Sequence, residues 1–374
     1  MYKLFRPFLF RMDAERAHDV SLRMAKYAQS LTPGMVSSLF EFEDERLKQR
    51  LLGSTFSNPL GLAAGADKNA VLVDFWEAVG FGFVEVGSVT AQASKGNPQP
   101  RAFRVQEDGA LINRMGLNNE GAAAVAKRLG ETRSQRKRPL GVNIAKTHSP
   151  DIMGEAAVED FRESFRLLAP QASYVALNVS CPNTREGKTF EDPEALDALL
   201  TVIMKEREAP ERRVPVLIKV SPPNSPRIVF DSELEEMIAI AVEHGVDGFI
   251  ATNTASDRSG LTAEETDLDQ IGQGGMSGAP LHARSTQMVR YLYRATDGET
   301  PIIGVGGIRD AETAYNMICA GASLIQMYTG LVYEGPGLVK QIKQGLVERM
   351  KRDDHTNIGE AVGTRSQIGE AAQV

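Results

Sequence analysis

Eight short apolar runs, rich in valine, isoleucine and glycine, recur along the chain from residue 59 onward, with longer amphipathic stretches between them. The runs do not alternate apolar with polar residues, which is typical of strands buried on both faces, and helical connections favour a parallel sheet. Eight such units in succession predict a (β/α)8 TIM barrel. The runs are Pro59 to Gly65, Phe83 to Val89, Leu140 to Ala145, Tyr174 to Cys181, Val214 to Ser221, Gly248 to Thr254, Pro301 to Ile308 and Leu324 to Gly330.

A doubly wound sheet is the alternative architecture, and its phosphate signature is a glycine-rich turn after the first strand. Residues 66–69 (ADKN) follow the first run here, and they do not match that signature. The glycines instead cluster at residues 304–308 (GVGGI), with residues 328–330 (YTG) ending the eighth run. Loops after strands seven and eight of a barrel often bind phosphate. The cluster therefore indicates a phosphorylated ligand or cofactor, although turn geometry alone would also explain it.

The first 45 residues form a separate unit with helical patterning. Asp13 is a suitable N-cap, and apolar residues recur after it at helical spacing until residues 32–34 (TPG) end the pattern. A shorter apolar stretch follows, so we expect a short α-helical extension that either packs on the barrel or meets lipid. Arg6, Pro7 and Arg11 interrupt the N-terminus, which excludes a signal peptide or a spanning helix there.

Composition narrows the classes of partner. The formal net charge of −7 gives no basic surface, so we expect no nucleic-acid partner. The two cysteines, Cys181 and Cys319, have no metal-ligand spacing, and we expect no metal; Cys319 lies in an apolar helical stretch typical of a core. We expect three parts: the extension (1–45), the barrel (46–350) and a flexible, polar C-terminal tail (351–374).

Polar residues gather at the carboxyl ends of the predicted strands, where the chemistry of a barrel is located. Several carboxamides with two lysines suit a small planar anion, because an amide can donate to one edge and accept from the other. No histidine stands at these ends, so Cys181 is the obvious titratable candidate for a base. The polar residues are Asp67, Lys68, Ser88, Asn143, Asn178, Cys181, Asn183, Lys219, Thr252, Asn253 and Thr254, with residues 113–119 between runs two and three.

Six segments resemble dihydroorotate dehydrogenases in order and spacing, over about residues 45–345. Residues 9–18 (LFRMDAERAH) also look like the extension typical of the quinone-linked class, which the soluble classes lack. The six segments are residues 63–68 (AAGADK), 113–119 (NRMGLNN), 178–184 (NVSCPNT), 250–254 (IATNT), 274–278 (GGMSG) and 304–308 (GVGGI).

This resemblance implies a bound FMN. Lys219 would be catalytic beside the flavin's pyrimidine ring, where a cation stabilises the reduced form, and Cys181 would be the catalytic base. The residues implied in FMN binding are Ala64, Gly65, Ser88, Asn143, Asn178, Lys219, Thr252, Gly278, Gly306, Gly307, Tyr328 and Thr329. Those implied in substrate binding are Lys68, which would pair with the carboxylate, and Asn113, Arg114, Met115, Gly116, Leu117, Asn118, Asn178, Asn183, Asn253 and Thr254.

The implied reaction is oxidation of dihydroorotate to orotate in pyrimidine biosynthesis. A base would take a proton from C5 while a hydride leaves C6 for the flavin N5, and ubiquinone or menaquinone would then reoxidise the flavin. The N-terminal helices would form an apolar tunnel that leads to the flavin edge. The protein would be a peripheral membrane protein on the cytoplasmic face of the cell membrane. His18, Arg104 and Tyr328 are candidates for the inner end of the tunnel, although Arg104 would also suit a surface ion pair.

Cys181 departs from the quinone-linked pattern, which usually has serine, and residues 185–193 are also more like the soluble forms. The alternative is therefore a soluble dihydroorotate dehydrogenase that uses fumarate or, through an iron–sulfur and flavin partner subunit, NAD. Dihydrouridine synthases and dihydropyrimidine dehydrogenases share such barrels, but RNA-binding charge and iron–sulfur cysteines are both lacking here. A thiol, with a pKa of about 8.5, ionises more readily than an alcohol, which predicts useful rates at lower pH.

Overall fold

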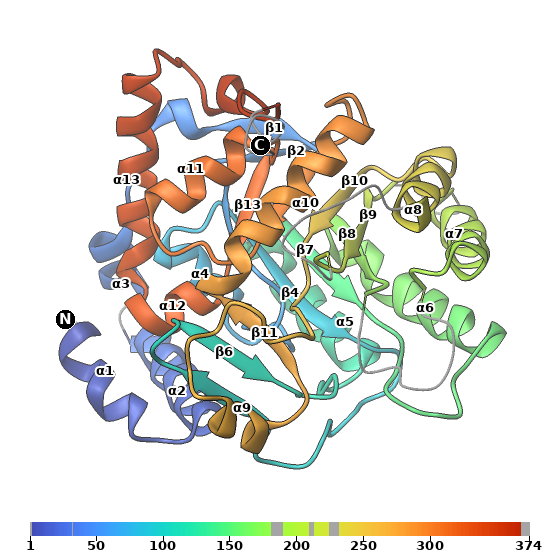
Figure 1. The fold of residues 1–374 in the computed structure, drawn as a ribbon, viewed down its shortest axis with the longest axis horizontal. Coiled ribbons are helices and arrows are strands. Elements are labelled where there is room, and N and C mark those ends of the chain that lie inside the picture. The colour runs from blue at the N-terminus through green and yellow to red at the C-terminus, as the bar shows by residue number, and fades with distance from the viewer. Residues whose placement is uncertain (1, 32, 181–189, 209–212, 224–231, 368–374) are drawn as a thin grey trace.

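Eight parallel strands close into a barrel, and each lies within one of the predicted runs (Figure 1). The computed structural model describes residues 2–31, 33–180, 190–208, 213–223 and 232–367. The prediction of a (β/α)8 barrel is thereby confirmed. The strands are β3 (Leu60–Leu62), β4 (Phe83–Val89), β7 (Leu140–Ile144), β8 (Tyr174–Asn178), β9 (Val216–Val220), β10 (Gly248–Ala251), β12 (Ile302–Val305) and β13 (Leu324–Met327), and β13 pairs with β3 to complete the ring.

Large apolar side chains fill the amino-terminal end of the barrel. Phe56, Phe83 and Tyr174 are fully buried in one cluster there, and the hairpin of β1 (Gln49–Leu51) and β2 (Ser54–Phe56) supplies the first of them. Gly141 leaves room for Tyr174, because a Cβ on that glycine would lie 2.2 Å from the ring Cζ. Since this end is packed shut, a binding site can open only at the carboxyl end.

Helices surround the barrel, and most of them bury one face against it, whereas α9 packs on strands outside the barrel. In α6, for example, Phe161, Phe165 and Leu168 recur at helical spacing and are buried. Cys319, at the end of α11, is a free and buried thiol, as predicted. The helices are α4 (Val73–Val79), α5 (Ala122–Thr132), α6 (Glu155–Leu168), α7 (Pro193–Glu208), α8 (Ser232–Glu243), α9 (Glu265–Ile271), α10 (His282–Ala295), α11 (Ala311–Cys319), α12 (Thr329–Glu334) and α13 (Gly337–Arg352).

The N-terminal extension contains three helices: α1 (Tyr2–Phe10), α2 (Ala14–Leu31) and α3 (Pro33–Phe40). Asp13 caps α2 as predicted, because its Oδ1 accepts the backbone N–H groups of Glu15 and Arg16 at 3.0 Å. The sequence pattern did not reveal α1, which contains Pro7. Across the described ranges, no helix has both the length and the apolar character that crossing a bilayer requires.

A three-stranded antiparallel sheet outside the barrel was not predicted. It joins β5 (Ala102–Val105) and β6 (Ala110–Asn113), inserted between β4 and β7, to β11 (Gly275–Gly278). Figure 1 shows this sheet beside α1 and α2. The sheet therefore borders the extension, and its strand β5 contacts α2.

The prediction of a flexible tail from residue 351 is wrong for residues 353–367. Ile358 and Ala361 are fully buried, and the backbone N–H of Arg365 donates to the carbonyl of Cys319 at 2.8 Å. Two small anchors are too few to produce a persistent apolar pattern, yet they fix the segment against α11. Residues 368–374 lie outside the described part of the chain.

Candidate active site

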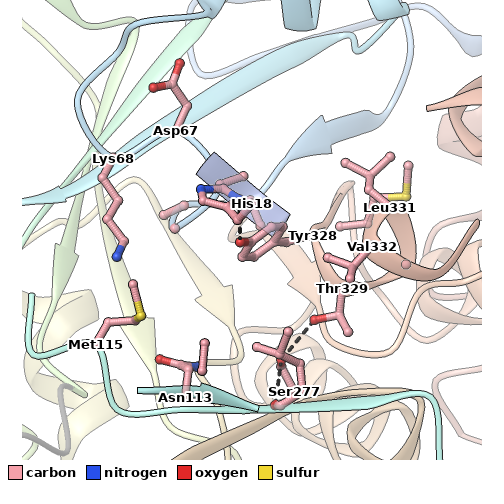
Figure 2. Close-up of a pocket in the computed structure, with 18 of the residues that line it drawn as sticks. His18, Asp67, Lys68, Asn113, Met115, Ser277, Tyr328, Thr329, Leu331 and Val332 are labelled. Atoms are coloured by element: carbon pink, nitrogen blue, oxygen red, sulfur yellow. Dashed lines mark hydrogen bonds between the residues drawn. The ribbon is translucent and has the colours of Figure 1, made fainter. Parts of the chain in front are cut away.

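A cavity of 720 Å³ occupies the carboxyl end of the barrel and continues beneath the N-terminal helices (Figure 2). Its floor is polar and is made by strand ends, whereas α1 and α2 contribute an apolar arm. Among the predicted site residues, the cavity is lined by His18, Ala64, Gly65, Lys68, Ser88, Arg104, Asn113, Met115, Gly116, Leu117, Asn118, Asn178, Lys219, Thr252, Asn253, Thr254, Gly278, Gly306, Gly307, Tyr328 and Thr329.

Four predicted residues do not line the cavity or cannot be placed. Asn143 is fully buried just below the floor, and Cys181 and Asn183 lie outside the described residues. The expectation that Arg114 lines the substrate pocket is wrong. Its guanidinium stacks 4.7 Å from the ring centroid of Phe103 and donates to the carbonyl of Gln273, so it points away from the cavity.

A chain of hydrogen bonds fixes the polar floor. Asn143 donates to Glu85 Oε1 at 3.1 Å, and Ser88 donates from its hydroxyl to Asn143 Oδ1. Asn178 Nδ2 in turn donates to the Ser88 hydroxyl at 3.0 Å. Each amide can take only one orientation in this series of hydrogen bonds, because its nitrogen already faces an acceptor and its oxygen already faces a donor. The floor is therefore pre-organised rather than adaptable.

Asn178 and Asn253 lie side by side at the ends of β8 and β10. Asn253 Nδ2 donates to Asn178 Oδ1 at 3.2 Å and to the carbonyl of Ser180 at 3.1 Å, and Asn253 Oδ1 accepts the backbone N–H of Thr254 at 2.9 Å. Thr252 instead turns toward α10, where its hydroxyl meets that of Ser285 at 2.7 Å. These contacts bring together amides that are up to 75 residues apart in sequence.

Lys219, near the end of β9, places a buried cation at the cavity. Burial lowers the pKa of its ammonium, and Glu85 opposes that shift. Glu85 is already occupied, because it accepts from Asn143, from the hydroxyl of Tyr174 at 2.8 Å and from Gln326 at 2.7 Å. Within the described residues, no hydrogen bond ties down the Lys219 ammonium. It is therefore available to an electron-rich group in the cavity.

Lys68 supplies the second cation, in the loop after β3. Its ammonium donates to Asn118 Oδ1. Burial, followed by the charge of Arg101, lowers the pKa of Lys68 to about 8. Asp67 next to it serves the loop, since its carboxylate accepts the backbone N–H groups of Val71 at 2.9 Å and Leu72 at 2.8 Å.

The opposite wall of the cavity is made largely of backbone. Gly278, Gly306 and Gly307 line it together with Tyr328 and Thr329. Gly307 has a φ of +66°, and a Cβ there would lie 2.6 Å from the Cβ of a neighbouring histidine in α10. Glycine is therefore required at Gly307, because only a residue without a side chain lets this loop pack against α10.

His18 and Tyr328 meet where the polar floor joins the apolar arm. The Tyr328 hydroxyl lies 3.4 Å from His18 Nδ1. Burial raises the pKa of Tyr328 to about 12 and lowers that of His18. Arg104 also faces the cavity, but backbone carbonyls of the extension hold it, including that of Leu9 at 3.1 Å. Its alternative assignment to a surface ion pair does not fit these contacts.

Sequence reasoning missed several lining residues. Ser277, whose hydroxyl lies 2.9 Å from that of Thr329, comes from the unpredicted strand β11. Phe5, Leu9 and Leu22 line the apolar arm, and the only signal for them was the concentration of large apolar residues near the N-terminus. In the described part of the chain, no group of three or more His, Cys, Asp or Glu side chains could hold a metal ion.

Comparison with known proteins assigns the family. The family model for dihydroorotate dehydrogenase matches residues 46–350. "Dihydroorotate dehydrogenase (quinone)" of Roseiflexus sp. (strain RS-1) is 44% identical over 365 residues, covering 97% of this chain and 98% of the relative. The protein of that name from Nocardia farcinica (strain IFM 10152) is 42% identical over 365 residues, covering 97% of this chain and 96% of the relative.

A solved structure agrees with the sequence comparisons. The crystal structure of DHODH from Eimeria tenella in complex with ferulenol is 32% identical, with a TM-score of 0.79, and the match covers 91% of this chain and 96% of that one. The protein therefore belongs to the dihydroorotate dehydrogenase family.

Proposed function

We propose that the protein oxidises dihydroorotate to orotate and passes the electrons through bound FMN to a membrane quinone. The observation that carries this proposal is the continuity of the cavity. A polar floor with two cations and several amides leads directly into an apolar arm beneath α1 and α2. A polar substrate and a lipophilic acceptor can thus reach one bound cofactor from different sides. Family membership supports the same substrate.

The residues fit FMN. The wall formed by Gly278, Gly306, Gly307, Tyr328 and Thr329 suits a phosphate, because most of it lies in the loops after the seventh and eighth barrel strands, where backbone N–H groups can bind one. FMN, when bound, supplies acceptance of a hydride and release of electrons to a second acceptor. Lys219 would neutralise the charge that the reduced ring carries, and Thr252, Ser88 and Asn178, supported by Asn143, would meet its polar edge, with Ala64 and Gly65 against its surface.

The remaining floor fits the substrate. Lys68 would exchange its hydrogen bond with Asn118 for one to the substrate carboxylate, and such charge-assisted bonds are the stronger kind. The amides of Asn113, Asn178 and Asn253, with Thr254, would hold the carbonyl and N–H edges. Residues 115–117 would close the pocket from above. Cys181 would take the C5 proton, and Asn183 would join the amides.

The extension suits a lipophilic acceptor at a membrane surface. Leu4, Phe5 and Phe8 of α1 and Met24 of α2 are exposed, and Phe5 and Met24 also line the cavity. We propose that this apolar surface rests on the cytoplasmic face of the cell membrane and admits ubiquinone or menaquinone from it, past His18 and Arg104. Cys181 and the loop after it favour a soluble acceptor instead. The quinone reading is preferred because the relatives named for quinone match the extension as well as the barrel.

Anaerobic titration with dihydroorotate tests the substrate. The protein should purify yellow and release FMN on denaturation. Dihydroorotate should bleach the flavin, with one orotate formed for each flavin reduced. In Lys219→Met, dihydroorotate should reduce a smaller fraction of the flavin, because the buried cation that would stabilise the reduced ring is gone. An FMN-loaded protein that dihydroorotate fails to bleach would refute the proposed substrate.

A further inference from the structure

We propose that Glu15, a residue of the N-terminal extension, positions the substrate pocket on the barrel. Through its ion pair with Arg101, Glu15 would hold the segments around Met115 and Asn118 and keep Lys68 charged for the substrate carboxylate. This inference rests on the proposed function and deepens it. The extension would then serve the oxidation of dihydroorotate, not only the route to the acceptor.

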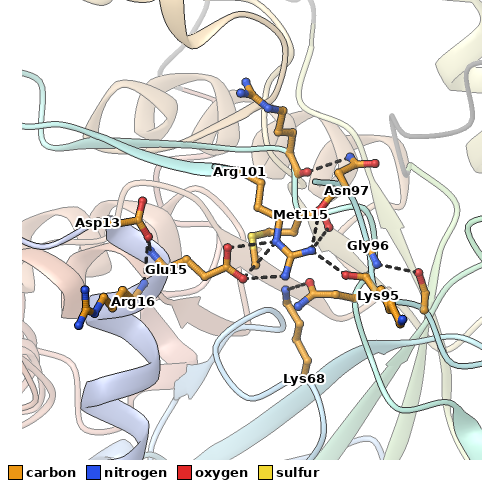
Figure 3. A network of polar contacts seen from close by, with 12 residues as sticks. Asp13, Glu15, Arg16, Lys68, Lys95, Gly96, Asn97, Arg101 and Met115 are labelled. Carbon is orange, nitrogen blue, oxygen red and sulfur yellow. Dashed lines mark hydrogen bonds and ion pairs between the residues drawn. The ribbon is translucent and has the colours of Figure 1, made fainter. Parts of the chain in front are cut away.

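The ion pair joins two parts of the chain that are 86 residues apart (Figure 3). Arg101 Nη2 lies 2.7 Å from Glu15 Oε1, and Arg101 Nε lies 3.1 Å from both carboxylate oxygens. Both side chains are only 9% exposed. Glu15 stands in the first turn of α2, which Asp13 caps, so the carboxylate is delivered from a fixed helix end.

The other edge of the Arg101 guanidinium binds the loop that contacts the predicted substrate pocket. Its Nη1 donates to the carbonyl of Lys95 at 2.7 Å and to that of Asn97 at 2.8 Å. Asn97 in turn donates its backbone N–H to the carbonyl of Met115 at 3.0 Å. Met115 lines the cavity in the same segment as Asn118, which accepts from Lys68. Hydrogen bonds, together with the short chain segment from Met115 to Asn118, therefore connect the extension to Lys68.

Electrostatic interactions form a second link between the extension and Lys68. The charged and titratable groups that act on Lys68 or respond to its charge are Glu15, His18 and Asp19 of α2 and Arg101. Arg101 lowers the pKa of Lys68, whereas Glu15 and Asp19 raise it. Glu15 thus offsets the effect of Arg101. With Glu15 neutral, Asp19 would still oppose Arg101 but Glu15 would not, and the Lys68 pKa would fall below its value of about 8.

A purely structural role explains less of this arrangement. Two apolar side chains could hold α2 on the barrel without the cost of burying two charges, because buried ion pairs are weak stabilisers. Apolar side chains could not supply the donors that Arg101 offers to the loop carbonyls. They also could not set the charge state of Lys68.

The test is Glu15→Gln in the full-length, FMN-loaded protein. We expect KM for dihydroorotate to rise several-fold near pH 8, where the charged fraction of Lys68 is most sensitive to its pKa, and to rise less at a pH well below the Lys68 pKa. The alkaline limb of kcat/KM should move to lower pH. The dissociation constant of orotate, followed by the change in flavin absorbance, should rise in parallel, while KM for a soluble quinone analogue stays unchanged.

Two further variants make the result specific. Glu334→Gln is the matched control, because among the described residues its ion pairs are those with Lys3 and Arg6 of α1 at the surface, at 3.8 and 4.0 Å; it should leave orotate binding unchanged. Asp19→Asn removes an exposed charge that also raises the Lys68 pKa, so it should fold normally and give a smaller shift in the same direction. It serves as the readout if Glu15→Gln does not retain FMN.

The outcomes separate the two proposals. An unchanged orotate affinity and pH profile in Glu15→Gln, or a loss confined to the quinone reaction, would overturn the role of Glu15. Failure of the unaltered protein to be reduced by dihydroorotate would overturn the proposed function instead.

Discussion

Lys68 should make dihydroorotate oxidation fall off at alkaline pH. Its pKa of about 8, against 10.5 for an ordinary lysine, means that the ammonium is charged below about pH 8 and neutral above it. Only the charged form can pair with the substrate carboxylate. A hydrogen bond to a charged group contributes roughly 1.5–3 kcal/mol, so losing it should cost roughly 10-fold to 100-fold in affinity. We expect kcat/KM to fall as the pH rises above the Lys68 pKa and to level off roughly 10-fold to 100-fold below its value at lower pH.

Anaerobic stopped-flow reduction of the flavin measures this limb directly. The alkaline limb in kcat/KM reports the pKa of Lys68 in the protein without substrate. The limb in kcat reports its pKa in the complex with substrate, and it should lie at higher pH because the bound carboxylate stabilises the charged lysine. Lys68→Arg is the matched variant, since arginine keeps its charge over the whole range. It should bind more weakly but show no limb. The same alkaline limb in Lys68→Arg, or a flat profile in the unaltered protein, would refute the reasoning.

Four further predictions test other parts of the account. Cys181→Ser should slow flavin reduction at neutral pH and move the pH optimum upward, because an alcohol ionises less readily; an unchanged pH profile would remove Cys181 as the base. Gly307→Ala should lower the FMN content, measured as flavin per chain after denaturation, because a Cβ there would push the loop away from α10; full occupancy would argue against the phosphate wall. Phe8→Glu should weaken flotation with lipid vesicles, whereas Leu167→Glu, at an exposed site on α6, should not; equal binding would contradict the membrane surface. Ile358→Ala should lower the free energy of unfolding by about 3 kcal/mol in denaturant titration, and a negligible change would mean that the C-terminal segment is not anchored.

The barrel was predictable because its strands are buried on both faces and therefore read as continuous apolar runs. The outer sheet was not, because β11 pairs with β6 from a distant segment, as Gly275 opposite Asn113 illustrates. Helix α1 was hidden by Pro7, and the turn at Ile358–Ala361 was hidden because Ile358 and Ala361 are its two buried residues. In each case a long-range contact stabilises a segment whose local pattern is weak.

Much of the candidate site was predictable for a geometric reason. Strand ends of a barrel converge, so polar residues at those ends must share a cavity. The direction of individual side chains was not, and Arg114 shows this, since its guanidinium turns away from the cavity to stack on Phe103. The Glu15–Arg101 pair was also hidden, because charged residues are ordinarily solvated and only the packing of α2 buries these two.

The acceptor is the claim on which the account depends most. After anaerobic reduction with dihydroorotate, the protein should be mixed with a soluble ubiquinone analogue, with fumarate and with NAD, and the return of flavin absorbance followed for each. The account predicts fast reoxidation by the quinone and slow reoxidation by the other two. Preference for fumarate or NAD would contradict it and would show that Cys181 and its loop were the better guide to the acceptor.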